Sequence, residues 1–545
     1  MKRRTIATLV LLATALSIIS TSVASADTIY VPDDYATIQS AVTNANIDDI
    51  IIVRNGTYTE NVDVDKQLTI HSENGAASCI VNASDPYDNV FEILADSVVI
   101  NGFTVQNATG YSMGDWKHAG IQVTDGDHVN ISDCVAENNV FGIRADSSYY
   151  SEITRNIVRD NTYGIYLSSS PYATLTENAL LNSRVRNLDT SGMNTDSYWH
   201  KHTIDTTNTV NGKPVYYYTD TSNLILETRN AGHISLIDCT GATVRGCSVI
   251  GCDELRIIST DDSLIVGNMV CGTEYAIRLL YSDNNIVLDN IANNNTNGIR
   301  VQYGDNNWVE NNTLQRDQQG VFVEGCDNTT VIYNMIEDSI GYGCWLYNNN
   351  RVLCNMIRGS TYYGLYINGC SNLVSGNTIS DSGDTPRSGG ISLSGYSSDN
   401  LIYNNYLDNP NNSRDDGTNN IWNATNATGL NIIGGPEIGG NYWSDYPGTD
   451  GDGDGFGDTP YNIAGGSSHD CLPLVYAPAT CGDIDGDRDI DTFDLLRLLE
   501  YIVTGTQVPA CTGDIDGNGH INTLDVRLLM GHIDDSTRYP LNCGC

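Results

Sequence analysis

"NNTLQRDQQGVFVEGCDNTTVI", residues 311–332, follows the same plan as "NMIRGSTYYGLYINGCSNLVSG", residues 355–376. Both contain short β-rich stretches separated by Gly and Asn turns, and neither contains a stretch of helical periodicity. Segments of this kind recur at spacings of 22, 22, 22, 21 and 22 residues, counted between Asn268, Asn290, Asn312, Asn334, Asn355 and Asn377. A β-rich repeat of about 22 residues predicts a solenoid.

Coils of this length stack their strands in parallel and fill the interior with Ile, Val and Leu. We therefore expect a mainly β fold, a right-handed parallel β-helix solenoid, the right hand being the usual one. The repeated asparagine predicts a stacked amide ladder at a turn, and Asn156 and Asn178, also 22 apart, extend the solenoid toward the N-terminus. One helical face suited to covering its open end holds Ile38, Ala41, Val42 and Ala45.

Alignment of the repeats predicts which side chains point into the solenoid and which point outward. Five strands align: AIRLL, GIRVQ, GVFVE, GCWLY and GLYIN. The alignment predicts that one residue of each points inward: Ile277, Ile299, Val321, Cys344 and Leu365. Their neighbours point outward, about 4.8 Å apart from coil to coil: Arg278, Arg300, Phe322, Trp345 and Tyr366. Aromatic rings stack on sugars and guanidinium groups pair with acidic sugars, so we interpret these five as a carbohydrate-binding stripe. Alternatively, they lie under an insertion or only stiffen the sheet.

Two acidic loops are repeated near the C-terminus, in GDIDGDRDIDTFDLLRLLEYI (482–502) and GDIDGNGHINTLDVRLLMGHI (513–533). Oxygen side chains fall at loop positions 1, 3, 5, 9 and 12, a spacing that wraps one hard cation, and we predict Ca²⁺. The first loop would use Asp483, Asp485, Asp487, the carbonyl of Asp489, Asp491 and Asp494. The second would use Asp514, Asp516, Asn518, the carbonyl of His520, Asn522 and Asp525.

An amphipathic helix is predicted after each loop and none before it, because Pro478 and Pro509 stand in the preceding segments. A duplicated loop–helix unit without entering helices resembles a dockerin type I domain, which implies a small α-helical calcium-binding domain that docks to a cohesin. The resemblance implies that loop positions 10 and 11 contact the cohesin: Thr492, Phe493, Thr523 and Leu524. Two calcium-stapled helices without a partner are the alternative.

A third loop of calcium type is predicted at the end of the solenoid, where Asp450, Asp452, Asp454 and Asp458 follow one another in GTDGDGDGFGD. We divide the chain into a signal peptide (1–26), N-terminal β-helix coils with a helical cap (27–185), an irregular insertion (186–234), β-helix repeats (235–446), a calcium-type loop and linker (447–477) and the dockerin-like domain (478–545).

The segment HTIDTTNTVNGKPVYYYTD (202–220) and most of residues 27–446 resemble the NosD-type, carbohydrate-binding β-helix proteins of the periplasm or cell surface. The best-known members of that family assist copper-site assembly. Here nine His and seven Met are scattered, and His200 and His202 form the only close His pair, so a copper accessory role is the least favoured interpretation.

The composition of the chain indicates where the protein is located and which partners are disfavoured. A basic start, an apolar stretch and Ala-Ser-Ala at 24–26 predict an exported chain, and no later run approaches the ~20 apolar residues of a membrane helix. A net charge of −40 disfavours nucleic acid and anionic membranes. Of the fifteen cysteines, we expect Cys252 and Cys271 to form a local disulfide.

We therefore expect a secreted or cell-surface protein that presents or binds a polysaccharide through its β-helix and docks to a cohesin through its C-terminal domain. The alternative is a polysaccharide lyase or glycoside hydrolase, which would need a carboxylate pair or a basic residue beside a sugar site. Poor candidates are Asp261 and Asp262, which fit a turn better, and Lys201 with His202. No motif assigns a catalytic residue.

Overall fold

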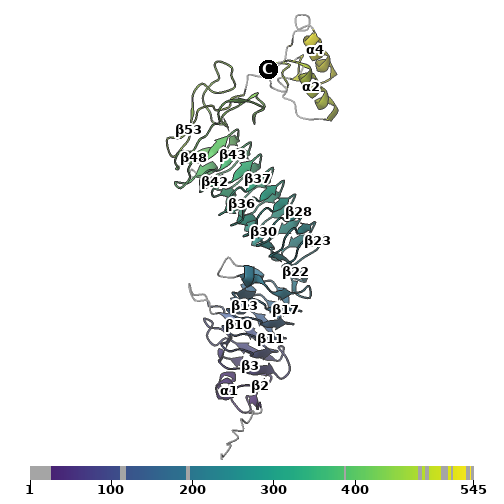
Figure 1. Cartoon of the computed structure of the whole chain (residues 1–545), viewed down its shortest axis with the longest axis vertical. Coiled ribbons are helices and arrows are strands. Elements are labelled where there is room, and N and C mark those ends of the chain that lie inside the picture. The colour runs from purple at the N-terminus through teal and green to yellow at the C-terminus, as the bar shows by residue number, and fades with distance from the viewer. Residues whose placement is uncertain are drawn as a thin grey trace, which may run out of the picture.

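The computed structural model describes residues 26–110, 118–191, 197–385, 388–476, 481–484, 490–504, 513–516, 520–534 and 541. Within these residues the chain winds into a parallel β-solenoid of about 17 turns, as expected from the repeat (Figure 1). Helix α1 (Ile38–Asn44) lies at one end of the solenoid. It buries Ile38, Ala41 and Val42 in the solenoid core, which confirms the predicted cap.

Three parallel sheets form the first half of the solenoid. They run from β1 (Thr28–Val31) to β20 (Thr203–Ile204), from β3 (Gly56–Thr59) to β21 (Thr209–Val210), and through the six strands that we call the β4–β19 sheet. The last is built from β4 (Val62–Val64), β7 (Phe91–Ile93), β10 (Ala119–Thr124), β13 (Phe141–Asp146), β16 (Tyr163–Ser168) and β19 (Arg186–Ser191).

A hairpin starts the second half. Strand β22 (Lys213–Thr219) pairs antiparallel with β21, and every later pairing along its sheet is parallel. This β22–β48 sheet continues through β24 (His233–Ile237), β27 (Leu255–Ile258), β30 (Tyr275–Leu280), β33 (Asn297–Gln302), β36 (Gln319–Glu324), β39 (Tyr342–Leu346), β42 (Tyr363–Ile367), β45 (Gly389–Leu393) and β48 (Ser413–Asp415). The other two sheets have nine strands each, from β23 (Ile225–Glu227) to β46 (Leu401–Tyr403) and from β26 (Ser248–Ile250) to β51 (Tyr442–Trp443).

The segment 186–234, expected as an irregular insertion, differs from that expectation. Its strands β19, β20 and β21 each complete a sheet of the first half, and β22 and β23 each begin a sheet of the second. The 22-residue period is lost because the connections lengthen: Asn178 donates to Asn208, 30 residues away, rather than to a residue 22 away. The solenoid is therefore continuous through a junction between its halves.

The asparagine repeat forms the predicted amide ladder. The backbone N–H and Nδ2 of Asn290 both donate to Oδ1 of Asn312, at 2.9 and 3.0 Å, and Asn312 repeats the pattern on Asn334. Nδ2 of Asn312 also donates to the carbonyl of Val287 at 2.9 Å. The buried amides of these asparagines are thereby satisfied by the turns on either side, which indicates that the repeated asparagine is structural.

Close contact between turns explains the glycine near the start of most strands of the β22–β48 sheet. A Cβ atom on Gly343 would lie 2.5 Å from Cγ2 of Ile357 and 2.6 Å from the carbonyl oxygen of Gly364 in the next turn. Both contacts are shorter than van der Waals distances. A larger residue at this position would push adjacent turns apart.

The C-terminal helices are α2 (Thr492–Thr504) and α4 (Thr523–Asp534). Each follows one of the two acidic loops, as predicted, and they share a small core of Ile484, Leu498, Ile515 and Leu529. The segments before the loops, 477–480 and 505–512, lie outside the described residues, as do the 25 residues that contain most of the expected signal peptide.

The expected disulfide between Cys252 and Cys271 is absent: both residues are free cysteines. Burial raises the pKa of both thiols. Cys481, in contrast, is disulfide-bonded. None of the described helices is long and apolar enough to cross a membrane.

Candidate functional site

The outward stripe expected from the repeats lies in register on the β22–β48 sheet. Arg278 pairs with Arg300, Arg300 with Phe322, Phe322 with Trp345 and Trp345 with Tyr366 on neighbouring strands. The inward residues expected beside them, from Ile277 to Leu365, are all fully buried. Strand alternation therefore places the stripe on the outer face of the solenoid.

The aromatic part of the stripe is a packed cluster. Ring centroids of Phe322 and Trp345 lie 4.9 Å apart, and those of Trp345 and Tyr366 lie 5.4 Å apart, both edge to face. Trp345 and Tyr366 are half-buried, but Phe322 is only 5% exposed because Arg300, Trp345 and Tyr347 surround it. The inclusion of Phe322 among sugar-contacting residues is thus corrected: it supports the other rings.

A second aromatic column runs beside the stripe, three residues earlier on each strand. It is formed by Tyr275, Tyr342 and Tyr363, with Asn297 and Gln319 in the intervening register positions. The Tyr342 ring lies 5.0 Å from Trp345 and 5.4 Å from Tyr366, so both columns make one surface. We call this surface, Tyr342, Trp345, Tyr363 and Tyr366, the aromatic face. The sequence interpretation predicted Trp345 and Tyr366 but missed Tyr342 and Tyr363, because strict alternation does not predict two outward positions three residues apart.

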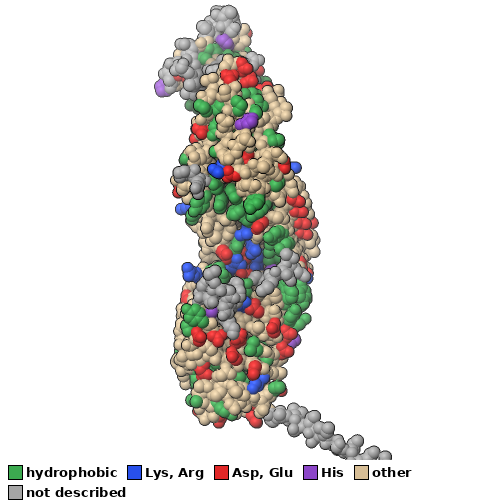
Figure 2. All heavy atoms as spheres, turned by 90° about the vertical axis from the view of Figure 1, so that its left-hand side faces the viewer, with side chains coloured by type: hydrophobic (Ala, Val, Ile, Leu, Met, Phe, Trp, Pro, Cys, Tyr) green, Lys and Arg blue, Asp and Glu red, His purple; other side chains and the backbone are tan. Residues whose placement is uncertain are grey.

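Arginines continue the stripe toward the junction between the halves. The guanidinium of Arg278 lies 4.9 Å from the Tyr275 ring and that of Arg300 lies 4.5 Å from the Phe322 ring. Arg300 also pairs with Glu324 at 3.5 Å. Figure 2 shows this side of the molecule, with basic side chains gathered midway along the solenoid and hydrophobic side chains above them.

The next arginine in the column, Arg256, closes the junction. It is 1% exposed, its Nη2 donates to the hydroxyl of Thr190 at 2.6 Å, and its Nη1 lies 3.4 Å from Asp189 in β19. In the same junction Arg186 pairs with Asp189 at 2.6 Å and with Glu274 at 2.7 Å. These ion pairs hold the last strand of the β4–β19 sheet against the β22–β48 sheet.

Buried Glu254 lies within this charged junction. Although burial opposes its ionisation, the positive charges of Arg186, Arg256 and Arg278 hold the pKa of Glu254 below its ordinary value. Glu254 is 3% exposed, and Nη1 of Arg256 lies 3.6 Å from its carboxylate. The cluster is balanced in charge and inaccessible, which indicates a structural role.

Among the candidates for catalysis, Lys201 and Asp261 have structural partners and His202 is buried. Lys201 pairs with Asp220 at 2.8 Å and with Asp238 at 3.1 Å, while burial lowers the pKa of His202 to about 3. Oδ1 of Asp261 accepts the backbone N–H of Asp283 at 2.7 Å, and Asp283 accepts that of Asp305 in the same way. Asp261 therefore belongs to a ladder of turn carboxylates, as the turn interpretation expected.

In the second C-terminal loop the structure brings together Asp514, Asp516 and Asp525, whose carboxylate oxygens lie within 4.8 Å of one another. Asp525 is fully buried and accepts the backbone N–H groups of Ile515 and Asn522, both at 2.8 Å. The first loop repeats this arrangement, because fully buried Asp494 accepts from Ile484 at 2.5 Å and from Asp491 at 2.8 Å. Four further expected ligands, Asp485, Asp487, Asp489 and Asn518, lie outside the described residues, whereas Asp483, Asp491, His520 and Asn522 are described.

The carboxylate oxygens of these loops suit a calcium ion as ligands. Oxygen atoms suit a hard divalent cation, and clustered buried carboxylates repel one another unless a cation neutralises them. The residues expected to contact a cohesin, Thr492, Phe493, Thr523 and Leu524, are exposed at the starts of α2 and α4. Phe493 is 62% exposed and Leu524 45%, so two apolar side chains occupy equivalent places in the duplicated unit.

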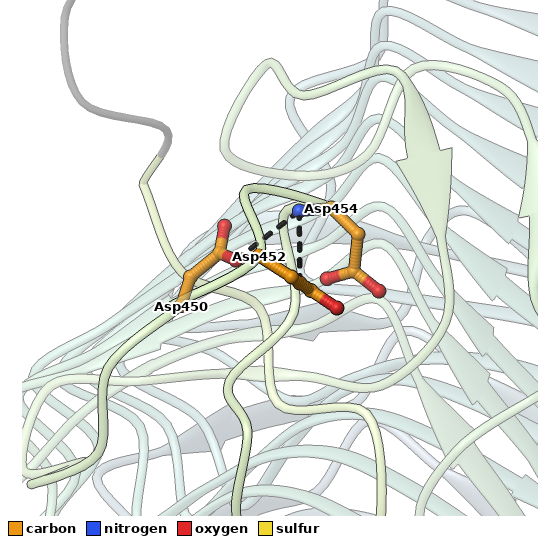
Figure 3. Close-up of side chains that lie close together, drawn as sticks. All are labelled: Asp450, Asp452 and Asp454. Carbon is orange, nitrogen blue, oxygen red and sulfur yellow. Dashed lines mark hydrogen bonds between the residues drawn. The ribbon is translucent and has the colours of Figure 1, made fainter.

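The third loop brings three of its four expected ligands together. The carboxylates of Asp450, Asp452 and Asp454 lie within 4.8 Å of one another, and the backbone N–H of Asp454 donates to Oδ1 of Asp450 at 3.1 Å (Figure 3). Asp458 is not in this group, and its Oδ2 accepts the backbone N–H of Gly451 at 2.9 Å. Asp458 thus closes the loop.

The fold and the paired loops define a class of protein: a parallel β-helix with a duplicated loop–helix unit at its C-terminus. The chain belongs to the NosD family, described as periplasmic copper-binding protein (NosD), whose profile matches residues 20–217 and 240–448. Residues 481–534 match the dockerin type I domain. Both agree with the resemblances stated from the sequence.

Several solved β-helix structures are similar to the chain at low identity. The catalytic unit of a GH87 α-1,3-glucanase from Streptomyces thermodiastaticus strain HF3-3 is 12% identical, covers 72% of this chain and 68% of its own, and has a TM-score of 0.30. DFA-IIIase from Arthrobacter chlorophenolicus A6 without its lid is 13% identical, with coverage of 69% and 94% and a TM-score of 0.29. The periplasmic alginate epimerase AlgG is 12% identical, with coverage of 72% and 84% and a TM-score of 0.27. No curated protein matches the chain.

The described residues do not fit the copper named in the family description. Among them, the two groups of three close metal-ligating side chains consist of aspartates alone. Copper prefers imidazole, thiolate or thioether ligands. His200 and His202, the expected close pair, are both buried, and burial lowers their pKa values to about 4 and about 3.

Proposed function

We propose that this protein is an exported, calcium-dependent carbohydrate-binding protein that holds a glycan on the aromatic face of its β-helix and docks to a cohesin through its C-terminal domain. The single observation that carries the glycan part is the continuity of the aromatic face. It supplies side chains from two successive turns, β39 and β42, at the spacing of a parallel sheet, about 4.8 Å.

The chemistry of this face suits sugar rings. Tyrosine and tryptophan rings combine apolar faces with a polar tip, and sugars present both C–H faces and hydroxyl groups. Trp345 and Tyr366 are half-buried, and Tyr362, whose ring lies 6.0 Å from that of Tyr342, is 51% exposed. A rigid sheet orders these rings before binding, which reduces the entropy lost on association.

The docking part rests on the dockerin type I match and on the paired buried aspartates, Asp494 and Asp525. Calcium held in each loop would fix the start of the helix that presents Phe493 or Leu524 to a partner. We propose that the protein lies outside the cell, which the predicted signal peptide and the dockerin type I match support. We propose no catalytic activity: Lys201 is held in ion pairs, Asp261 accepts a backbone N–H in a turn, and His202 is buried.

Affinity electrophoresis against a panel of neutral and acidic polysaccharides tests the glycan part. The Trp345→Ala, Tyr366→Ala double variant should keep the parent's circular dichroism, because neither ring fills the solenoid interior, and should lose at least threefold in affinity for the retained glycan. The matched control replaces Trp308 and Tyr333, which are 43% and 56% exposed away from this sheet. Equal retention of the parent and the double variant would refute the aromatic face as a binding surface.

A further inference from the structure

A groove lies between the two halves of the solenoid. Its volume is about 920 Å³. It is lined by residues 183–185, Asn187 and Asn211 where the halves meet, and by five successive turns of the second half, from Gly251 to Ile340. Five turns at about 4.8 Å give it a length of roughly 20 Å. The groove is therefore long enough for several sugar units.

The groove holds arginines that lack a carboxylate partner. Most arginines in the described part of the chain pair with an acid, as Arg155 does with Asp133 and Arg358 with Glu337. Arg184 and Arg316 line the groove, are exposed, and make no ion pair with any described carboxylate. One groove therefore holds two exposed guanidinium groups without an ion pair to a described carboxylate, in a chain whose net charge is −40.

The one carboxylate among the lining residues does not cancel this charge. Glu274 is occupied by Arg186, whose Nε donates to it at 2.7 Å. The other polar lining residues carry amides and hydroxyls that can bind sugar hydroxyl groups, and Asn294, Thr296 and Gln318 among them are exposed. The groove thus offers a local positive charge surrounded by neutral hydrogen-bonding groups.

The groove borders the second outward column, which leads to the aromatic face along the sheet. Glu274 and Gln318 line it, and each directly precedes a residue of the second outward column, Tyr275 or Gln319. Arg278 lies against the other side of this column, 4.9 Å from the Tyr275 ring. A glycan lying across the starts of these strands would reach Arg184 and Arg316 with its substituents.

We infer that the groove binds the anionic groups of an acidic glycan, carboxylate or sulfate, through Arg184 and Arg316. Guanidinium groups bind both anions with paired N–H donors. This inference rests on the proposed function and adds the class of substrate. The negative net charge of the protein disfavours binding of an acidic polymer, so a preference for acidic glycans can arise only from a local positive site. Salt at 0.15 M screens charges that lie more than about 8 Å away.

Two matched pairs of polymers test the inference. The first pair is polygalacturonate and its methyl ester; the second is dextran sulfate and dextran. At 0.15 M salt the parent should bind one acidic member at least tenfold more tightly than its neutral counterpart, and the pair showing the preference tells carboxylate from sulfate. The Arg184→Gln, Arg316→Gln variant should lose most of that preference while keeping binding that depends on Trp345 and Tyr366.

The control removes the same charge elsewhere, through Arg351→Gln and Arg527→Gln, both exposed and without an ion pair to a described carboxylate. It should keep the acid preference. Equal affinity of the parent for both members of each pair, or a groove variant that keeps the full preference, would overturn this inference alone. A parent that is retained by no polysaccharide would overturn the proposed glycan binding and this inference together.

Discussion

Asn295 donates its backbone N–H and its Nδ2 to the same oxygen of Asp317, at 2.7 and 2.9 Å. Asp317 thereby occupies a ladder position that is asparagine in the preceding turn, and its second oxygen, Oδ2, is buried without a hydrogen-bond partner. At the preceding position the equivalent atom, Nδ2 of Asn295, also donates to the carbonyl of Val270 at 3.3 Å. An aspartate can reproduce such a donor only when it is protonated.

The first prediction is that Asp317→Asn stabilises the solenoid in alkaline solution. Burial raises the pKa of Asp317 from 3.8 to about 7. The folded state therefore holds a proton that the unfolded state has lost between these pH values, so stability falls as the pH rises from about 4 to 7 and stays low above. Asparagine removes this loss, and urea unfolding at pH 8 should show a gain of about 2–4 kcal/mol.

The same comparison at pH 4 should show little difference between the parent and Asp317→Asn. Asp305→Asn is the control, because Asp305 is an exposed turn residue that also accepts a backbone N–H, from Asp327. A less stable Asp317→Asn variant at pH 8 would contradict the prediction.

The second prediction concerns the amide ladder. Asn312→Ala removes the acceptor of two N–H groups of Asn290 and the donor to the carbonyl of Val287. Unsatisfied buried groups cost about 1–3 kcal/mol each, so the variant should lose at least 2 kcal/mol in urea unfolding. Asn130→Ala, whose Nδ2 bonds to Glu152 at the surface, should change stability by less than about 1 kcal/mol. Equal losses of unfolding free energy in both variants would show that the amide ladder does not stabilise the solenoid.

The third prediction is that Arg256 holds the two halves together. Arg256→Ala leaves buried Glu254 without its nearest cation and Asp189 with Arg186 alone, and breaking a buried ion pair costs about 3–5 kcal/mol. We expect faster hydrogen exchange in β19 and β27 and a lower unfolding midpoint. Arg351→Ala, which removes an exposed arginine from β40 (Arg351–Leu353), should leave both measurements near those of the parent. Unchanged exchange at the junction in Arg256→Ala would show that the ion pairs are dispensable.

The fourth prediction is that calcium orders the C-terminal domain. Excess EDTA should reduce the helical circular dichroism of the full chain and weaken binding to a cohesin, because the buried aspartates then repel one another. Asp525→Ala should impair cohesin binding more than Asp534→Ala, since Asp525 is fully buried among the loop carboxylates and Asp534 is exposed at the end of α4. Helicity and cohesin affinity that both survive EDTA would refute calcium dependence.

The sequence by itself determined the solenoid, the strand register and the duplicated acidic loops. These features are local: each turn repeats its neighbour about 22 residues away, so the alignment of Arg278 with Arg300 or of Asn290 with Asn312 can be read from spacing alone. The same spacing could not predict the tyrosines of the second column, because their outward direction arises from a local departure from strand alternation.

Only the tertiary structure decided how the two halves meet. Arg256 and Asp189 are 67 residues apart, and Arg186 and Glu274 are 88 apart, so no repeat relates them. Their pairing turns the expected insertion into a continuous junction, buries Arg256 and leaves Arg184 and Arg316 facing a groove. Phe322 was expected to contact sugar, but its neighbours on adjacent turns cover it, so it packs beneath the other rings instead. Periodicity predicts which residues are neighbours on adjacent turns, whereas burial and charge pairing depend on contacts between distant segments.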